Sequence, residues 1–228
     1  MKVNKINNLL ELFYLQYKKQ DKDSIFLEFL KDPVKKYSWK ETYLNIIKLS
    51  KEISKYIYKG DRCLLISENR PEWMMTDLSI MLSKGITVPA YTTYTDRDYE
   101  YIIDDCSPSI IFVSNKTQYE KIKNIIPKKN FIKKIIIFDS IPDLKDEFIL
   151  DINKIFNNQN YEIKDFYNLE IYRKDIACII YTSGTQGNPK GVMLSHGGIL
   201  NNCEGSCDLL KSIISKKPKF LTWLPLSH

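Results

Sequence analysis

Short apolar runs alternate with amphipathic stretches along most of this chain. The apolar runs follow Gly60 and read RCLLIS, TVPAY, SIIFVS and KKIIIFD. Between them lie ENRPEWMMTDLSIMLSKG, RDYEYIIDDC and TQYEKIKNII, in which apolar residues recur at helical spacing. Apolar strands separated by helices are typical of a parallel sheet covered on both faces. The pattern therefore predicts an α/β fold with a mostly parallel sheet flanked by helices.

Local signals mark several helix ends. The region before about Ile57 is predicted to be helical, and Ser38 with Glu41 three residues later has the spacing of a capping box. Pro71 stands at the first turn of the helix after RCLLIS, and Gly85 is its expected stop.

The second half of the chain is less regular. From Ser140 to Arg173 polar and aromatic residues predominate, which indicates a long connection or an insertion. IACIIY then restarts the sheet, GVMLSH is predicted to be a strand, and GGILNNCEGSCDLLKSII is predicted to be a helix. KFLTWLPL is expected to form a last strand.

Composition and charge narrow the class of protein. The 228 residues are 43% hydrophobic, enough for one large or two small domains. No run approaches the ~18 apolar residues of a membrane-spanning helix, and the N-terminus lacks the features of a signal peptide. Five scattered cysteines fit a reducing cytosol. The net charge of +6 comes with no arginine-rich stripe or base-stacking motif, so no nucleic-acid partner is expected.

The segment YTSGTQGNPKG, residues 181–191, has the composition of a phosphate-binding loop. Its glycines allow backbone N–H groups to converge on an anion, and Lys190 adds a positive charge. Thr182, Ser183 and Thr185 add hydroxyls that can donate to phosphate oxygens or bind magnesium. An ordinary turn also favours such residues, but this ordered combination is far more specific.

The segment does not fit a Walker A loop. That motif needs a glycine before the lysine and Ser or Thr after it, where this chain has Pro189 and Gly191. A Walker A loop also opens onto a helix, whereas GVMLSH is predicted to be a strand.

YTSGTQGNPKGVMLSH, Tyr181 to His196, instead resembles the signature loop of the adenylate-forming (AMP-binding) superfamily. NRPEW at residues 69–73 and WLPLSH at residues 223–228 resemble motifs of its long-chain fatty-acid–CoA ligase branch. The resemblance implies that ATP activates a fatty acid to an acyl-adenylate, from which the thiol of coenzyme A accepts the acyl group. Fatty acid, ATP and coenzyme A are then the small-molecule partners, with Mg²⁺ as the metal ion.

The resemblance also implies roles for individual residues. The residues expected to bind the β- and γ-phosphates are Thr182, Ser183, Gly184, Thr185, Gln186, Gly187 and Lys190. Thr185 is the candidate magnesium ligand, and Gln186 stands where the family more usually has Thr. His228 is the candidate residue at the entrance of the acyl pocket, with a structural histidine at a strand end as the alternative.

A metal site at His196, Cys203 and Cys207 is a weaker hypothesis. Both cysteines share an apolar helix face with Leu200 and Leu210, which favours packing in the core.

The family's adenine, ribose and catalytic-lysine motifs lie downstream of WLPLSH. We therefore expect residues 1–228 to be the N-terminal part of the large domain of such an enzyme, incomplete at the C-terminus and without the small C-terminal domain. Alone, the chain is expected neither to adenylate fatty acids nor to fold stably. Two alternatives stay open, namely a ligase for aryl, short-chain or amino acids, and a non-catalytic nucleotide-binding remnant. The expected location is the cytoplasm, with peripheral contact at the inner membrane face as a further hypothesis.

Overall fold

A mixed sheet organises the molecule. The computed structural model describes residues 5–142, 144, 146–158, 169–182, 188–210 and 218–227. In this part of the chain the large sheet has the order β7-β6-β5-β3-β4-β8-β9. Neighbouring strands are parallel from β7 to β8, and only β9 runs antiparallel, against β8. The strand bounds are β3 (Arg62–Ile66), β4 (Ile86–Ala90), β5 (Ile110–Val113), β6 (Lys134–Ile137), β7 (Ile149–Asp151), β8 (Ile176–Thr182) and β9 (Lys190–Ser195).

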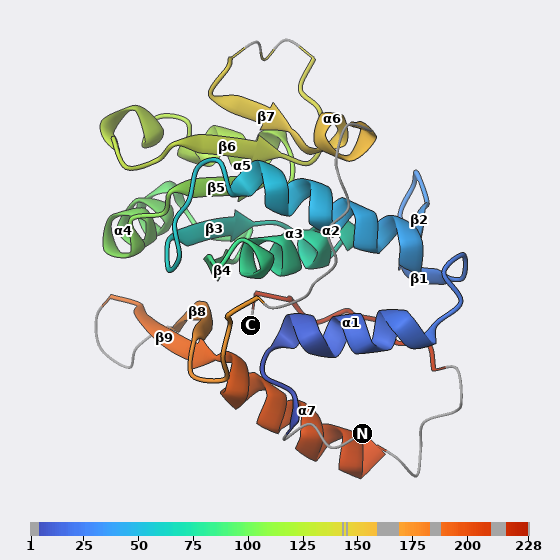
Figure 1. The fold of residues 1–228 in the computed structure, drawn as a ribbon. Helices are drawn as coiled ribbons and strands as arrows, with labels where there is room; N and C mark the ends of the chain where they lie inside the picture. The colour runs from blue at the N-terminus through green and yellow to red at the C-terminus, as the bar shows by residue number, and fades with distance from the viewer. Residues whose placement is uncertain are drawn as a thin grey trace.

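Helices cover both faces of the parallel strands (Figure 1). One face carries α2 (Trp39–Ile53), α3 (Pro71–Leu82) and α6 (Ile152–Asn157), with α1 (Leu9–Lys19) packed beside them. The other face carries α4 (Asp96–Cys106) and α5 (Lys116–Ile122). The predicted α/β class with a mostly parallel sheet is therefore confirmed.

The two cores meet along the central strand β3. Cys63 and Leu65 point into the core under α2 and α3, and Leu64 and Ile66 point into the core under α4 and α5. All four are 0% exposed, as expected for a parallel strand covered on both faces.

The predicted helix starts are confirmed. Ser38 caps α2 in a complete capping box with Glu41, and Pro71 occupies the first turn of α3. The end of α3 differs from the prediction, which placed the stop at Gly85. The helix ends at Leu82, and Lys84 rather than Gly85 takes the left-handed conformation, with φ of 62°. Gly85 is needed for close packing instead, because a Cβ there would lie 2.8 Å from the Cδ1 of Ile57.

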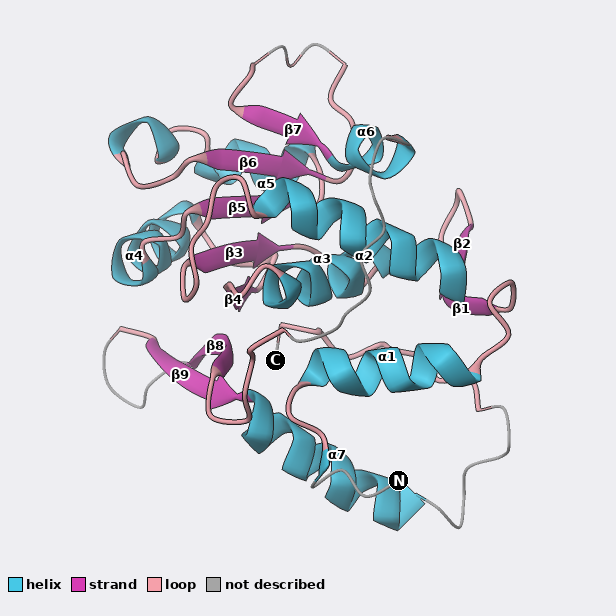
Figure 2. Cartoon of the chain, in the orientation of Figure 1, coloured by secondary structure: helices cyan, strands magenta, loops and turns pink. Residues whose placement is uncertain are grey.

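Part of the N-terminal prediction was wrong. The region before Ile57 contains an antiparallel hairpin of β1 (Ile25–Phe29) and β2 (Lys35–Ser38) between its two helices (Figure 2). The ring of Phe26 stacks on Trp39 of α2 at a centroid distance of 3.7 Å. This contact across the chain stabilises a strand that its short local pattern does not reveal.

The predicted last strand was also wrong, since the described residues 218–227 form neither strand nor helix. Their backbone groups bond to a side chain, that of Asn69, instead of to a neighbouring strand. The irregular region after Ser140 contains β7 and α6, which the sequence pattern did not indicate. None of the described helices is long and apolar enough to cross a membrane.

Candidate functional site

The glycine-rich loop is carried by a hairpin at the carboxyl edge of the sheet. β8 and β9 pair antiparallel, with Thr182 opposite Lys190 and Tyr181 opposite Gly191. The predicted strand after the loop is thus confirmed, and a helix of the Walker A type does not follow it. Thr182 and Lys190 are both exposed. Directly opposite residues of an antiparallel pair project to the same side, so the hydroxyl and the ammonium group can face one anion.

Two of the seven expected phosphate-binding residues, Thr182 and Lys190, are therefore placed together. The other five, and the expected acyl-pocket residue, lie outside the described residues: Ser183, Gly184, Thr185, Gln186, Gly187 and His228. Their roles stay predictions.

Helix α4 holds both ends of this loop. The hydroxyl of Tyr181, just before the loop, donates to the carboxylate of Asp105. The hydroxyl of Tyr101 donates to the backbone oxygen of Pro189, just before the lysine, at 3.1 Å. Burial, and then the hydrogen bond to Asp105, raise the pKa of the Tyr181 phenol, so it stays a donor. Tyr101 and Asp105 were not predicted, because the sequence shows only that they share a helix face.

Gly191 is required by the close approach of the Ile179 side chain. A Cβ at Gly191 would lie 2.8 Å from the Cγ2 of Ile179 and 3.4 Å from the Cζ of Tyr181. The glycine after the lysine therefore leaves room for Ile179 on the paired strand, with the ring of Tyr181 in ordinary van der Waals contact.

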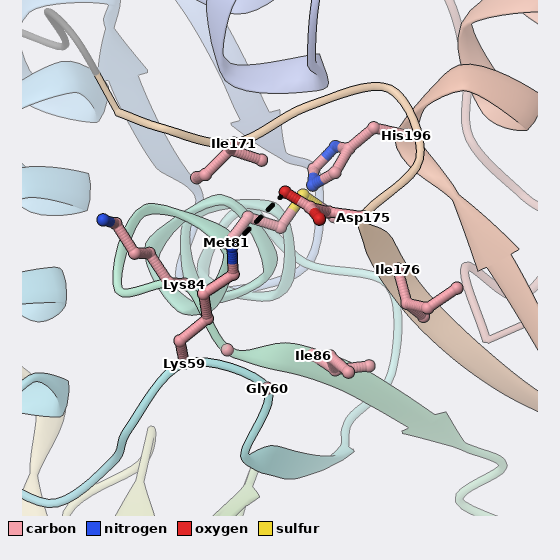
Figure 3. A pocket seen from close by; sticks show the side chains of 10 residues that line it. Lys59, Gly60, Met81, Lys84, Ile86, Ile171, Asp175, Ile176 and His196 are labelled. Atoms are coloured by element: carbon pink, nitrogen blue, oxygen red, sulfur yellow. Dashed lines mark ion pairs between the residues drawn. The ribbon is translucent and has the colours of Figure 1, made fainter.

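A cavity of about 160 Å³ opens at the opposite edge of the sheet (Figure 3). It is lined by Ile86 and Ile176, which begin β4 and β8, and by His196. Lys59 and Asp175 form an ion pair of 3.7 Å beside it. Because the loop follows the carboxyl end of β8, this cavity is separate from the candidate phosphate site.

His196 is a structural residue in this arrangement. It begins α7 (His196–Leu210), is 2% exposed, and its Nδ1 accepts the backbone N–H of Leu9 at 3.3 Å. Burial lowers the pKa of His196 to about 4, and the Asp175 carboxylate opposes the shift only in part. Cys203 is half-buried and Cys207 is exposed, so the expected core packing of Cys207 was wrong. Within the described ranges, no three histidine, cysteine or acidic residues could hold a metal ion.

Comparison with known proteins gives the family. The family model described as AMP-binding enzyme matches residues 15–228, and this chain belongs to that family. Long chain acyl-CoA synthetase 3 of Arabidopsis thaliana is 30% identical over 214 residues, 85% of this chain and 31% of the relative. Fatty acyl-CoA synthetase A of Dictyostelium discoideum is 29% identical over 182 residues, 75% of this chain and 26% of the relative. The chain thus spans less than a third of the length of these relatives.

Solved structures share the fold. Acetoacetyl-CoA synthetase from Streptomyces lividans superposes with a TM-score of 0.76 at 16% identity, over 88% of this chain and 32% of that one. O-succinylbenzoate coenzyme A synthetase from Bacillus subtilis superposes with a TM-score of 0.67 at 20% identity, over 95% and 50%. At these identities the likeness concerns the fold alone.

Removing the hydrogen bonds from α4 is expected to lower the protection of β9 against amide hydrogen exchange. In Tyr101→Phe and Tyr181→Phe, amide hydrogens of β9 are expected to exchange about fivefold faster, the effect of one lost hydrogen bond. Tyr119→Phe on α5, which lies outside the hairpin, serves as the control. Unchanged exchange in β9 of both variants, measured by mass spectrometry, would contradict the role of α4.

The buried His196 predicts a loss of stability in mild acid. Its folded pKa of about 4 lies below the unfolded value of 6.5, so only the unfolded chain gains this proton as the pH falls from 6.5 to 4. Between pH 7 and pH 5 we expect wild type to lose about 2 kcal/mol through this group. Desolvation raises the pKa of Asp77 to about 6, which acts in the opposite direction.

His196→Gln separates the two effects because Asp77 is unchanged in it. Urea unfolding at pH 7 and pH 5 should show a smaller acid-induced loss in the variant than in wild type. Equal losses in the two proteins would show that His196 does not titrate as described.

Proposed function

We propose that this chain supplies the phosphate-binding part of an ATP-dependent long-chain fatty-acid–CoA ligase. The carboxylate of the fatty acid attacks the α-phosphorus of ATP, and the bond to the bridging oxygen breaks to give acyl-adenylate and pyrophosphate. The thiol of coenzyme A then attacks the acyl carbonyl and releases AMP. In the complete enzyme the product is acyl-CoA.

The pairing of Thr182 with Lys190 is the observation that carries this proposal. The first step needs no protein nucleophile, because the carboxylate itself attacks. It needs orientation of the phosphates and stabilisation of the charge that develops on the leaving pyrophosphate. A lysine and a hydroxyl on one side of a hairpin that α4 holds in place suit that task.

Mg²⁺ is proposed as the companion of the nucleotide, where it would help to neutralise phosphate charge. Thr185 remains the proposed ligand and lies outside the described residues. Within the described part, the Thr182 hydroxyl beside the loop is a compatible oxygen donor.

The long-chain substrate is supported by the names of the relatives and by the apolar residues near the end of the chain. Four of these are large and exposed: Phe220, Leu221, Trp223 and Leu224. A ligase for an aryl, short-chain or amino acid is the alternative within the family. Exchange of labelled pyrophosphate into ATP, measured with acids of graded chain length, separates the two.

Removal of the lysine charge tests the phosphate site. In the protein expressed at the full length of its reading frame, Lys190→Met is expected to lower acid-dependent pyrophosphate exchange about a hundredfold. Lys174→Met, an exposed lysine before the other end of β8, is the matched control. Equal activity in Lys190→Met and wild type would overturn the role of Lys190. No exchange by wild type with any acid would overturn the proposed function, and exchange by residues 1–228 alone would overturn the expected inactivity of this part.

The cytoplasm, with peripheral contact at the inner membrane face, is the proposed location. A fatty-acid substrate and a net charge of +6 suit binding to anionic lipid. Part of the full-length protein is therefore expected in the membrane fraction at low salt and in the soluble fraction at high salt. Complete recovery in the soluble fraction at low salt would contradict membrane contact.

A further inference from the structure

The side chain of Asn69 holds the backbone of a segment more than 150 residues away. Its Nδ2 donates to the carbonyl oxygens of Thr222, at 3.2 Å, and Leu224, at 2.6 Å. Its Oδ1 accepts the backbone N–H of Leu226 at 2.9 Å. One amide therefore binds three backbone groups of residues 222–226, which form neither strand nor helix. Because these hydrogen bonds involve only the backbone of residues 222–226, they fix the path of the segment independently of its side chains.

The position of Asn69 is itself rigid. It lies three residues after the end of β3 and precedes Arg70, whose side chain is 7% exposed and lies near the rings of Phe29 and Phe138. The guanidinium donates through both terminal nitrogens to Asp139, at 3.2 and 2.9 Å, and through Nε to Glu72 at 2.8 Å. Bidentate pairs of this kind fix orientation as well as distance.

Glu72 ties the same turn to the small sheet. Its carboxylate is 1% exposed and also accepts from Lys35 Nζ at 3.0 Å and from the Tyr37 hydroxyl at 3.2 Å. Burial opposes ionisation, but the hydrogen bond and charge of Arg70 outweigh it and lower the pKa of Glu72 to about 2. The residue before Arg70 is thus set by a network of ion pairs and hydrogen bonds that joins β2 and α3 to the turns after β3 and β6.

The fixed segment has two distinct sides. Leu226 packs against the core and Ser227 is 5% exposed, whereas Trp223 is 76% exposed and Leu224 is 56% exposed. The contacts of Asn69 therefore hold the backbone down while large apolar side chains point outward. Asn69 follows β3 at the sheet edge where β8 ends in Thr182, with only β4 between those two strands. The outward apolar side chains of Trp223 and Leu224 and the candidate phosphate site thus lie at the same edge of the sheet.

We propose that Asn69 is a positioning residue for the acid substrate, acting through the backbone of residues 222–226. This inference rests on the proposed function, since it assigns those residues to the part of the site that receives the acyl chain. Asn69 itself does not touch the reacting atoms. It sets where the outward apolar side chains stand relative to the phosphate-binding hairpin.

Hydrogen exchange of the full-length protein tests the contact itself. In Asn69→Ala, the amide of Leu226 is expected to exchange about tenfold faster, because its acceptor and the two neighbouring contacts are lost. Asn115→Ala is the matched control, since Asn115 caps α5 at the same sheet edge and contacts Gln118 and Glu68 instead. Exchange of Leu226 that is equal in Asn69→Ala and wild type, or equally fast in Asn115→Ala, would overturn the contact.

Kinetics of the full-length protein test the positioning role. Asn69→Asp keeps the shape but loses both donors, and its carboxylate repels the two carbonyl oxygens. We expect the KM for the acid to rise about tenfold with the KM for ATP within about twofold of wild type, and Asn115→Asp to behave as wild type. A change in kcat alone, an equal rise in both KM values, or no change would overturn the positioning role. If wild type shows no acid-dependent exchange of pyrophosphate into ATP, the proposed function fails. Hydrogen exchange at the Leu226 amide then still tests the contact with Asn69.

Discussion

Burial of β3 on both faces is the constraint from which the rest of the arrangement follows. Its side chains alternate between two cores, so helices must cover both sides of the sheet. Parallel neighbours joined through those helices then end at one edge of the sheet. Asn69 after β3 and the hairpin after β8 are therefore brought to a common edge, although more than 100 residues separate them.

The candidate phosphate site depends on elements outside its own motif. The motif supplies Thr182 and Lys190, but α4 supplies the hydrogen bonds at Tyr181 and Pro189 that hold the hairpin. A loop rich in glycine has many conformations in the unfolded chain, and ordering it costs entropy. The contacts at Tyr181 and Pro189 fix the positions of the described residues at its two ends, so this part of the ordering is already complete when an anion binds.

The turn after β3, on the other side of β4 from the hairpin, is also held by contacts from other elements. The buried charges of Arg70 and Glu72 are compensated by one another and by Asp139 and Lys35. Such a network is costly to desolvate, and its best-supported benefit is a unique geometry. Here that geometry fixes the turn that carries Asn69, whose side chain binds the backbone of residues 222–226.

The sequence by itself determined the α/β class, the capped helix starts, the strand on each side of the loop and the family. These follow from local periods and from an ordered motif, which depend on residues near one another in the chain. Only the tertiary structure decided the β1–β2 hairpin, the contacts of Tyr101 and Asp105, and the irregular path of residues 218–227. In each case the deciding partner lies outside the local pattern: Trp39, 13 residues on, stacks on Phe26, α4 holds a loop more than 80 residues away, and Asn69 replaces a neighbouring strand more than 150 residues away. Local pattern carries no information about such partners, because their contacts form only when the chain has folded.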